Sequence, residues 1–575
     1  MIKLFRYLDE FTSQIVAIVV LIFFQVIANL YLPTLSSDII DKGIVNNDLN
    51  YILRIGGLML IISAGGVLCS VIAGFLSSRT AVALGMIIRG KIFEKVESFS
   101  LHEFDKLGTA TLITRTTNDV TQIQQVTVMM FSIMLFAPLT GIGGIIMALR
   151  EDKVLTWIFV VVIPVLFIII GSVLRKGLPL FKLMQVKLDK LNLVLREGLT
   201  GIRVIRAFNR IDNEKKRFDF ANRDLMDNSV KVNIIMAVLM PVMMLIMNLT
   251  TIAIFWFGSM RIDAGNMEVG ALMAFIQYGM QILFSFLMVA MMFIMIPRGQ
   301  ASAVRINEVL DMEPEIIDLE KTSLADEKSG YVEFKEVTFS YPGAEQPAIS
   351  NITFSAAPGE TTAIIGGTGA GKSTLVNLIP RFYDVLHGTV LVNGTDVRKI
   401  SQEDLRSKIG YVPQKNVLFS GTITENIKYG NDSATFDQIV HAADIAQATE
   451  FINGMDTGFD HFIAQGGTNV SGGQKQRLSI ARALVRKPEI YIFDDSFSAL
   501  DFKTDAKLRA ALKKETATAT VIIIAQRVAT VMDADRIIVL DDGLIAGMGT
   551  HKELLDSCSV YHEIVSSQLS EEELK

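Results

Sequence analysis

Long apolar stretches separated by shorter polar ones dominate the first 310 residues of the chain. Six of them are long enough to cross the hydrocarbon core of a membrane as helices, which takes about 20 residues at about 1.5 Å each. They cover residues 11–35, 55–77, 128–149, 154–174, 234–260 and 269–296. None contains Asp, Glu, Lys, Arg or His. The pattern therefore predicts six transmembrane helices and gives no support to ion coupling through charged groups inside the bilayer.

The loops after the second and fourth stretches, residues 78–127 and 175–233, are long and rich in Lys and Arg. Excess positive charge marks cytoplasmic loops, and an even number of crossings puts both termini on that same side. Residues 181–197 repeat apolar side chains at helical spacing. We therefore expect these loops to continue as helices beyond the bilayer, on both sides of a short break.

Composition agrees with a protein embedded in membrane lipid, because 50% of the 575 residues are apolar and only 20% are charged. Lys and Arg number 54 against 60 Asp and Glu, which gives a formal charge of −6. This balance excludes a nucleic-acid-binding surface built on net basicity. The two cysteines, Cys69 and Cys558, lie far apart in the sequence, which excludes a disulfide framework or a CxxC metal site.

Residues 311–330 are acidic, contain Pro314 and lack periodicity, which is typical of a linker. From residue 331 to 575, β-branched runs alternate with helical stretches, as at residues 361–365 followed by 372–382. This alternation predicts an α/β fold with a largely parallel sheet. The predicted domains are thus residues 1–310 in the membrane, a linker at 311–330 and an α/β domain at 331–575.

The clearest indication of a chemical function is a glycine-rich segment between a predicted strand and a predicted helix. Its residues are Gly366, Gly367, Thr368, Gly369, Ala370, Gly371, Lys372, Ser373 and Thr374. Glycines let backbone N–H groups close around phosphates, and the start of the following helix adds positive potential. In this P-loop pattern Lys372 neutralises the β- and γ-phosphates and Ser373 coordinates Mg²⁺.

Two further elements indicate the same chemistry. Residues 490–494 form an apolar strand pattern that ends in Asp494, a carboxylate at the strand end where parallel sheets meet their ligands. Asp494 would hold Mg²⁺ through water. Residues 470–477 form a second glycine turn that opens a helix, with Ser471 in the N-cap position. The N–H groups at that helix start are suited to bind another phosphate.

The order of these motifs resembles the ATP-binding cassette (ABC) transporters. The P-loop, Gln414 in a Tyr-Val-Pro-Gln segment, the Ser-Gly-Gly-Gln turn, the strand ending at Asp494 and residues 498–501 are similar to their nucleotide-binding domain. The six apolar stretches are similar to the membrane domain of ABC exporters. The resemblance covers nearly the whole chain. It implies an α-helical membrane domain fused to an α/β P-loop ATPase, located at the plasma membrane with the ATPase domain and both termini in the cytoplasm.

The same resemblance implies ATP and Mg²⁺ as cofactors and roles for individual residues. Tyr341 would stack on adenine, and Gln414 would reach Mg²⁺ and sense the γ-phosphate. Short coupling helices near Leu101–Leu107 and residues 209–214 would carry motion between the two domains. The turn that would cap an ATP held by a partner subunit consists of Ser471, Gly472, Gly473 and Gln474.

Two residues depart from the family pattern where ATP is cleaved. Asp495 stands where the family usually has a Glu that polarises the attacking water, and Gln526 stands where it usually has His. Asp is one methylene shorter, and a misplacement of about 1 Å costs about a hundredfold in rate. A Gln amide donates a hydrogen bond but neither carries charge nor relays a proton. We therefore expect weak hydrolysis at this site, the alternative being neutral drift in a working ATPase.

Because the P-loop, Tyr341 and Asp494 are intact, we expect ATP still to bind. In the head-to-tail dimers of this family, each nucleotide lies between the P-loop of one subunit and the Ser-Gly-Gly-Gln turn of the other. A second, non-identical half-transporter with an intact catalytic site would use the turn of this chain to complete its own site. The chain thus resembles the degenerate-site subunit of bacterial heterodimeric multidrug ABC exporters.

One face of the last apolar stretch indicates what crosses the membrane. It consists of Gln277, Gln281, Phe284, Met288, Met292 and Met295. Amides, an aromatic ring and thioethers together are able to re-pack around varied apolar molecules, which predicts small amphipathic substrates such as drugs or dyes. The alternative is that these side chains only fill gaps and hydrogen-bond between helices. A lipid or peptide flippase is the first rival function, and an ATP-gated channel or regulatory membrane protein is a more distant one.

Overall fold

The computed structural model describes residues 1–318 and 329–568, so the predicted linker lies partly outside the described residues. The chain divides into two compact units. The first comprises Met1–Glu97 and Thr109–Met312, and the second comprises Ser98–Gly108 and Glu313–Lys575. The short helix α4 (Leu101–Leu107) therefore belongs to the same unit as the α/β fold.

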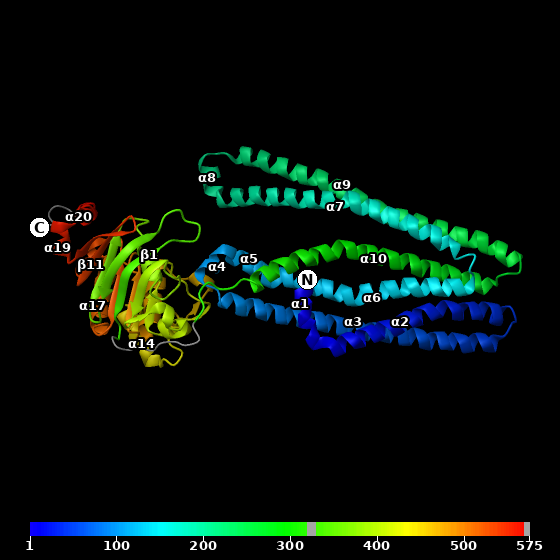
Figure 1. Ribbon diagram of the computed structural model, residues 1–575, viewed down its shortest axis with the longest axis horizontal. Coiled ribbons are helices and arrows are strands. Elements are labelled where there is room, and N and C mark those ends of the chain that lie inside the picture. Colours follow the sequence, from blue (N-terminus) through cyan, green and yellow to red (C-terminus); the bar gives the residue numbers. More distant parts are fainter. Residues whose placement is uncertain (319–328, 569–575) are drawn as a thin grey trace. The chain divides into compact units, whose positions relative to one another are not determined.

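Long helices build the first unit (Figure 1). They are α1 (Ile2–Phe5), η1 (Arg6–Phe11), α2 (Thr12–Asp38), η2 (Ile39–Ile44), α3 (Leu49–Glu97), α5 (Thr109–Thr114), η3 (Arg115–Asp119), α6 (Val120–Glu151), α7 (Trp157–Thr200), α8 (Ile202–Ala207), α9 (Ile211–Asp263) and α10 (Val269–Leu310). Counted with the short turns that continue them, six helices of the described residues are long and apolar enough to cross a membrane. This confirms the predicted number of transmembrane helices.

Glycines let α6 approach its two neighbours closely. A Cβ atom on Gly141 would lie 2.6 Å from Oγ of Ser285 in α10, and a Cβ on Gly143 would lie 2.3 Å from Cδ1 of Leu30 in α2. Small residues commonly bring transmembrane helices together in this way, because lipid provides no hydrophobic driving force between them. The three helices therefore form one packed group in the first unit.

The helices α7 and α9 run side by side, and α8 joins them at one end (Figure 1). This arrangement corrects one expectation, since the short helix of that loop is Ile202–Ala207 and does not cover residues 209–214. Asn209 has a left-handed φ of 51°, a conformation that ends a helix. Residues 208 and 209 therefore form a turn, and α9 begins at Ile211 after its N-cap residue Arg210.

The strands of the second unit form two larger sheets and one two-stranded sheet. The first sheet has the order β2-β1-β4-β5, the second β12-β11-β3-β10-β9-β6, and β7 pairs with β8. Their bounds are β1 (Val332–Phe339), β2 (Ile349–Ala356), β3 (Thr361–Gly366), β4 (His387–Val392), β5 (Thr395–Asp396), β6 (Ile409–Val412), β7 (Gly421–Thr422), β8 (Phe462–Ile463), β9 (Ile490–Asp494), β10 (Thr520–Ile524), β11 (Arg536–Asp541) and β12 (Leu544–Gly549). The six-stranded sheet is parallel except for its edge strand β12.

The helices of the second unit besides α4 follow the strands, as in parallel α/β folds. They are α11 (Lys372–Asn377), η4 (Val397–Lys399), α12 (Gln402–Ser407), α13 (Ile423–Lys428), α14 (Phe436–Ile445), α15 (Thr449–Asn453), η5 (Gly458–Asp460), η6 (Gln465–Gly467), α16 (Gly472–Val485), α17 (Phe502–Glu515), α18 (Val528–Val531), α19 (His551–Ser557) and α20 (Ser559–Ser566).

The strand β9 is buried on both faces, which explains its continuous apolar run. Ile492 packs into one hydrophobic cluster, and the next residue, Phe493, packs into the other. The neighbouring strand β10 is buried in the same way. The predicted α-helical membrane domain fused to an α/β domain with a largely parallel sheet is thus confirmed.

Candidate functional site

A glycine loop at the carboxyl end of β3 shapes the first candidate site. Gly366 closes this strand, and a Cβ atom on it would lie 2.2 Å from the carbonyl oxygen of Leu540. Gly371 has a φ of +90°, and a Cβ there would lie 2.7 Å from the carbonyl oxygen of Ala348. These two positions tolerate only glycine. The chain therefore turns tightly from β3 into α11, as a phosphate-binding loop requires.

The loop borders a cavity of about 360 Å³. The predicted residues that line it are Tyr341, Thr368, Gly369, Ala370, Gly371, Lys372, Ser373, Thr374, Gln414, Asp494, Asp495 and Gln526. Gly366 and Gly367 belong to the same loop but do not line the cavity. Ala348 and Ile524 complete the wall; the sequence analysis did not identify them, because no motif marks a small or apolar wall residue.

Lys372 lies across the loop. Its Nζ donates hydrogen bonds to the carbonyl oxygens of Gly366 at 2.9 Å and Gly367 at 2.6 Å. Burial lowers the pKa of Lys372, and the carboxylates of Asp495 and Asp494 oppose that effect. Hydrogen bonds between an ammonium group and phosphate oxygens are stronger than those to neutral carbonyls. The side chain is therefore ready to exchange its carbonyl partners for a phosphate.

Ser373 and Asp494 meet in the same cavity, where Oγ of Ser373 donates to Oδ1 of Asp494 across 3.0 Å. Burial raises the pKa of Asp494, while the hydrogen bond from Ser373 lowers it. With Gln414 these side chains offer only oxygen ligands, which suit Mg²⁺ bound through one or two carboxylates together with phosphate oxygens. Among the described residues, no group of three or more His, Cys, Asp and Glu is placed to hold a metal ion. The residues thus fit Mg²⁺ that arrives with a nucleotide.

Asp495 and Gln526 are in direct contact. Oδ2 of Asp495 accepts hydrogen bonds from Nε2 of Gln526 at 3.1 Å and from Nε2 of Gln414 at 3.5 Å. Burial raises the pKa of Asp495, whereas the Gln414 amide lowers it. Asp495 also has a left-handed φ of 48°, and its N–H donates to the carbonyl oxygen of Ile524 at the end of β10. The neighbouring strands β9 and β10 thus bring together the two residues that depart from the family pattern.

Tyr341 stands at another side of the cavity. Its hydroxyl group shares a hydrogen bond of 3.0 Å with Oγ1 of Thr374. The ring packs edge-on against Phe339 and Tyr383, with centroids 5.0 and 5.4 Å away. It remains 37% exposed. A supported and partly exposed ring of this kind is suited to stack on a flat base.

The turn made by Ser471, Gly472, Gly473 and Gln474 lies outside this cavity, at the start of α16. Oγ of Ser471 accepts a hydrogen bond from the backbone N–H of Gln474, and Oε1 of Gln474 accepts one from the N–H of Ser471. This reciprocal capping box confirms Ser471 as the N-cap residue. Ser471 and Gly472 are exposed, so the turn is accessible to a ligand that is held elsewhere.

The sequence analysis missed Glu103, a carboxylate of α4 that is only 3% exposed. Its Oε2 accepts the N–H of Ser100 at 2.7 Å, and its Oε1 accepts the N–H of Glu315 at 3.1 Å. Burial alone would raise the pKa of Glu103, but hydrogen bonds from the Ser100 side chain and from these backbone N–H groups hold that pKa below its ordinary value. A cavity of about 390 Å³ beside this contact reaches Tyr341. The Ser-x-x-Glu spacing of a capping box is the signal that would have found Glu103.

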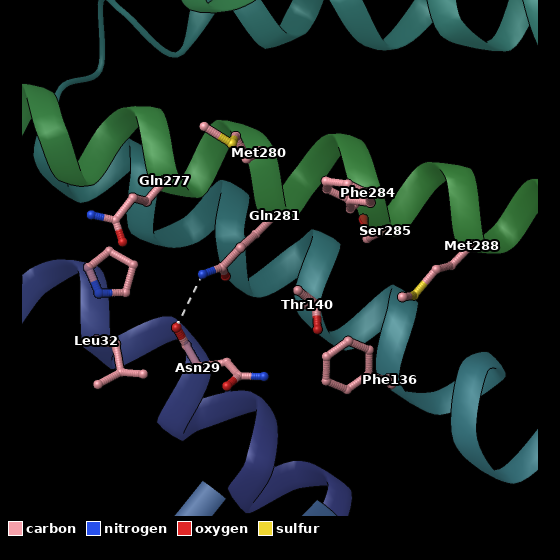
Figure 2. A pocket seen from close by; sticks show the side chains of 11 residues that line it. Asn29, Leu32, Phe136, Thr140, Gln277, Met280, Gln281, Phe284, Ser285 and Met288 are labelled. Carbon is pink, nitrogen blue, oxygen red and sulfur yellow. Dashed lines mark hydrogen bonds between the residues drawn. The ribbon is translucent and has the colours of Figure 1, made fainter. Parts of the chain in front are cut away.

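A second candidate site lies in the membrane unit, where a cavity of about 300 Å³ opens between α2, α6 and α10 (Figure 2). From the predicted substrate face, Gln277, Gln281, Phe284 and Met288 line it. Met292 and Met295 follow further along α10 and do not line it. Met292 is 7% exposed and is thus buried in the helix packing.

The other two helices contribute five of the eleven residues that line this cavity. From α2 come Asn29, Leu32 and Pro33, and from α6 come Phe136 and Thr140. The sequence analysis did not assign any of these five residues to a site. Helical periodicity shows which residues share one helix face, but it does not show which other helix lies opposite.

Comparisons with known proteins identify the family of both domains. The family described as "ABC transporter transmembrane region" matches residues 15–286, and the family described as "ABC transporter" matches residues 349–498. An uncharacterized ABC transporter ATP-binding protein of Mycobacterium tuberculosis is 41% identical over 567 residues, which are 98% of this chain and 97% of that protein.

Two further similarities concern proteins with more informative descriptions. A fatty acid ABC transporter ATP-binding/permease protein of Mycobacterium bovis is 34% identical over 83% of this chain and 75% of its own length. The solved structure of a bacterial Atm1-family ABC exporter with ATP bound matches with a TM-score of 0.82 at 25% identity. That match covers 97% of this chain and 99% of the other.

Proposed function

The chain belongs to the ABC transporters, and we propose that it is one subunit of a heterodimeric exporter that moves small amphipathic molecules out of the cell. It is a multi-pass membrane protein with an ABC-type ATPase domain. In this proposal the ATPase domain is cytoplasmic and binds ATP firmly. Hydrolysis takes place mainly in the site of a different partner chain.

The contact between Asp495 and Gln526 carries the proposal. A general base must reach the attacking water, and an Asp carboxylate extends one methylene less than Glu. Oδ2 of Asp495 also already accepts the hydrogen bond from the Gln526 amide. That amide is unable to take up a proton in turn. Two losses beside one γ-phosphate act as a unit, so cleavage at this site is expected to be slow.

We expect ATP binding to persist although hydrolysis is slow, because the residues proposed to contact the phosphates and the base are present. Lys372, Ser373 and Asp494 converge in one cavity with Tyr341. Mg²⁺ bound with the nucleotide would neutralise phosphate charge at Ser373, Asp494 and Gln414. The site is thus suited to hold a nucleotide for a long time.

The exposed turn at Ser471 supports the heterodimer. It keeps the capping box and the glycines of a phosphate-binding helix start, although it lies outside the cavity of its own chain. A partner with Glu and His at the two altered positions would place its own nucleotide against this turn. A dimer of identical chains would instead contain two slow sites.

Export of a lipid is a second candidate function. It is favoured by the relative described as a fatty acid transporter. The membrane cavity supports either function, since aromatic, thioether and amide groups line it. Stimulation of ATP hydrolysis distinguishes the two. Amphipathic dyes should stimulate the purified heterodimer in nanodiscs, whereas stimulation by fatty acids alone would favour lipid export.

Nucleotide measurements on the purified chain test the degenerate site directly. We expect the chain to bind a fluorescent ATP analogue with Mg²⁺ but to release phosphate at only about 1% of the rate of an intact exporter site. Lys372→Ala should weaken binding at least about tenfold, and Lys428→Ala, which removes an exposed lysine of α13, should not. Brisk ATP hydrolysis by the chain alone would overturn the proposal.

A further inference from the structure

The polar atoms of the membrane cavity are arranged by a proline in α2. Pro33 lies inside that helix and has no N–H group. The carbonyl oxygen four residues earlier, on Asn29, therefore lacks its usual partner within the helix. In a membrane such a freed carbonyl has to find a donor on a neighbouring helix.

Gln281 of α10 supplies that donor. Its Nε2 donates to the carbonyl oxygen of Asn29 across 3.2 Å, as the dashed line in Figure 2 shows. Only the NH₂ end of an amide is able to donate to a carbonyl. The hydrogen bond therefore sets the orientation of the Gln281 amide. Its carbonyl oxygen Oε1 is left to accept a hydrogen bond from another group.

Two polar oxygens at this cavity have no protein partner among the described residues. Oε1 of Gln281 is one, and Oγ1 of Thr140 is the other. Both atoms are buried, and Thr140 as a whole is 4% exposed. Oε1 of Gln281 is able only to accept a hydrogen bond, whereas the hydroxyl of Thr140 is able to accept or donate one. A buried acceptor without a partner costs free energy until something donates a hydrogen bond to it.

The rest of the lining limits the charge of such a donor. It consists of Asn29, Leu32, Pro33, Phe136, Gln277, Met280, Phe284, Ser285 and Met288, so none of the lining residues is ionisable. A ligand with a permanent charge would lose its hydration there without gaining a counter-ion. An uncharged aromatic body instead fits between Phe136, Phe284 and the methionines.

We infer that this cavity selects uncharged aromatic molecules that carry a hydrogen-bond donor, and that the carbonyl end of Gln281 recognises the donor. The inference rests on the proposed export function and deepens it by naming the substrate class. Gln281 acts as a specificity-determining residue, and Pro33 acts through the freed carbonyl of Asn29 as a positioning residue.

A matched pair of ligands tests the inference without ATP. 2-Naphthol and 2-methoxynaphthalene have the same ring system, but only the first is a donor. We expect the purified chain in nanodiscs to bind 2-naphthol about three- to tenfold more tightly, the effect of one hydrogen bond to a buried acceptor. Their intrinsic fluorescence reports the binding.

Variants separate recognition from structure. Gln281→Leu should abolish the preference for 2-naphthol while the ether still binds, and the near-isosteric Thr140→Val should reduce it. Pro33→Ala restores an N–H to α2, so Asn29 bonds within its own helix and the preference should weaken. Gln25→Leu removes an amide of the same helix that does not line the cavity, and it should leave the preference unchanged.

Equal binding of the two compounds by the unmodified chain would overturn the inference, as would a preference that survives Gln281→Leu. If the inference about the cavity is correct but the proposed export function is wrong, the result differs. The chain then binds 2-naphthol more tightly than the ether, but proteoliposomes containing the heterodimer do not transport 2-naphthol with ATP.

Discussion

The amide nitrogen Nε2 of Gln526 lies 3.1 Å from Oδ2 of Asp495 and donates a hydrogen bond to it. These residues follow the ends of two adjacent parallel strands, β10 and β9. The hydrogen bond occupies one lone pair of the carboxylate with a donor that cannot accept a proton in return. In the proposed function this pair slows ATP hydrolysis at a site that still binds ATP.

Restoring the family residues should therefore increase turnover. We expect Asp495→Glu combined with Gln526→His to raise phosphate release from this site about ten- to a hundredfold, because the longer carboxylate reaches the water and the imidazole relays a proton. The measurement uses the heterodimer in which the P-loop lysine of the partner chain is replaced. Adding Lys372→Ala to the double variant should remove the gain. No gain in a folded complex would show that the slow cleavage has another cause.

The buried carboxylate of Asp494 makes stability depend on pH. Burial raises its pKa above the ordinary value of 3.8. A carboxyl with a raised pKa favours folding when protonated, so the nucleotide-free protein should lose stability as the pH rises from about 4 through the folded pKa. Asp494→Asn should flatten this dependence and raise the melting temperature at neutral pH by about 2–4 °C.

Thermal unfolding followed by intrinsic fluorescence in detergent measures this effect. Asp533→Asn serves as the control, because that side chain is 88% exposed. An Asp494→Asn melting temperature equal to that of the unmodified protein at neutral pH would contradict the prediction.

The carboxylate of Glu103 should hold two backbone N–H groups in place. Glu103→Ala removes the acceptor for the N–H groups of Ser100 and Glu315. The loss of a hydrogen bond to a charged acceptor costs about 1.5–3 kcal/mol. We expect amide hydrogen exchange at these two positions to accelerate about tenfold or more, as measured by mass spectrometry. Glu313→Ala, which removes an exposed carboxylate two residues earlier, should leave the exchange unchanged; equal effects of both variants would argue against this role.

An ion pair between a buried carboxylate and a half-exposed arginine should stabilise the membrane unit where η3 meets α10. Asp119, whose side chain is 4% exposed, accepts hydrogen bonds from Nε of Arg305 at 2.8 Å and from Oγ of Ser302 at 2.9 Å. Arg305→Ala leaves this buried charge unpaired, which we expect to cost about 3 kcal/mol. Thermal unfolding in detergent provides the measurement.

The double variant Asp119→Asn with Arg305→Ala removes both charges and should recover most of that loss. Arg298→Ala removes an exposed arginine of the same helix and should change little. If the double variant were less stable than Arg305→Ala, the unpaired charge would not be the cause of the destabilisation.

Structural features that depend only on residues close together in the sequence were predictable from the sequence. The six apolar helices follow from runs of side chains that must avoid water. The capping box at Ser471 and the glycine loop before Lys372 follow from hydrogen bonds and φ angles within a few residues. The buried strand β9 could be recognised because its apolar run leaves no polar face.

Contacts between distant segments were decided by the tertiary structure alone. Gln281 meets the carbonyl of Asn29 across 252 residues of chain, and Glu103 meets the N–H of Glu315 across 212. Each of these contacts uses a backbone group, and every residue carries similar backbone groups. No sequence pattern therefore indicates which one a side chain will find; only the packing of helices and strands brings the partners within hydrogen-bonding distance.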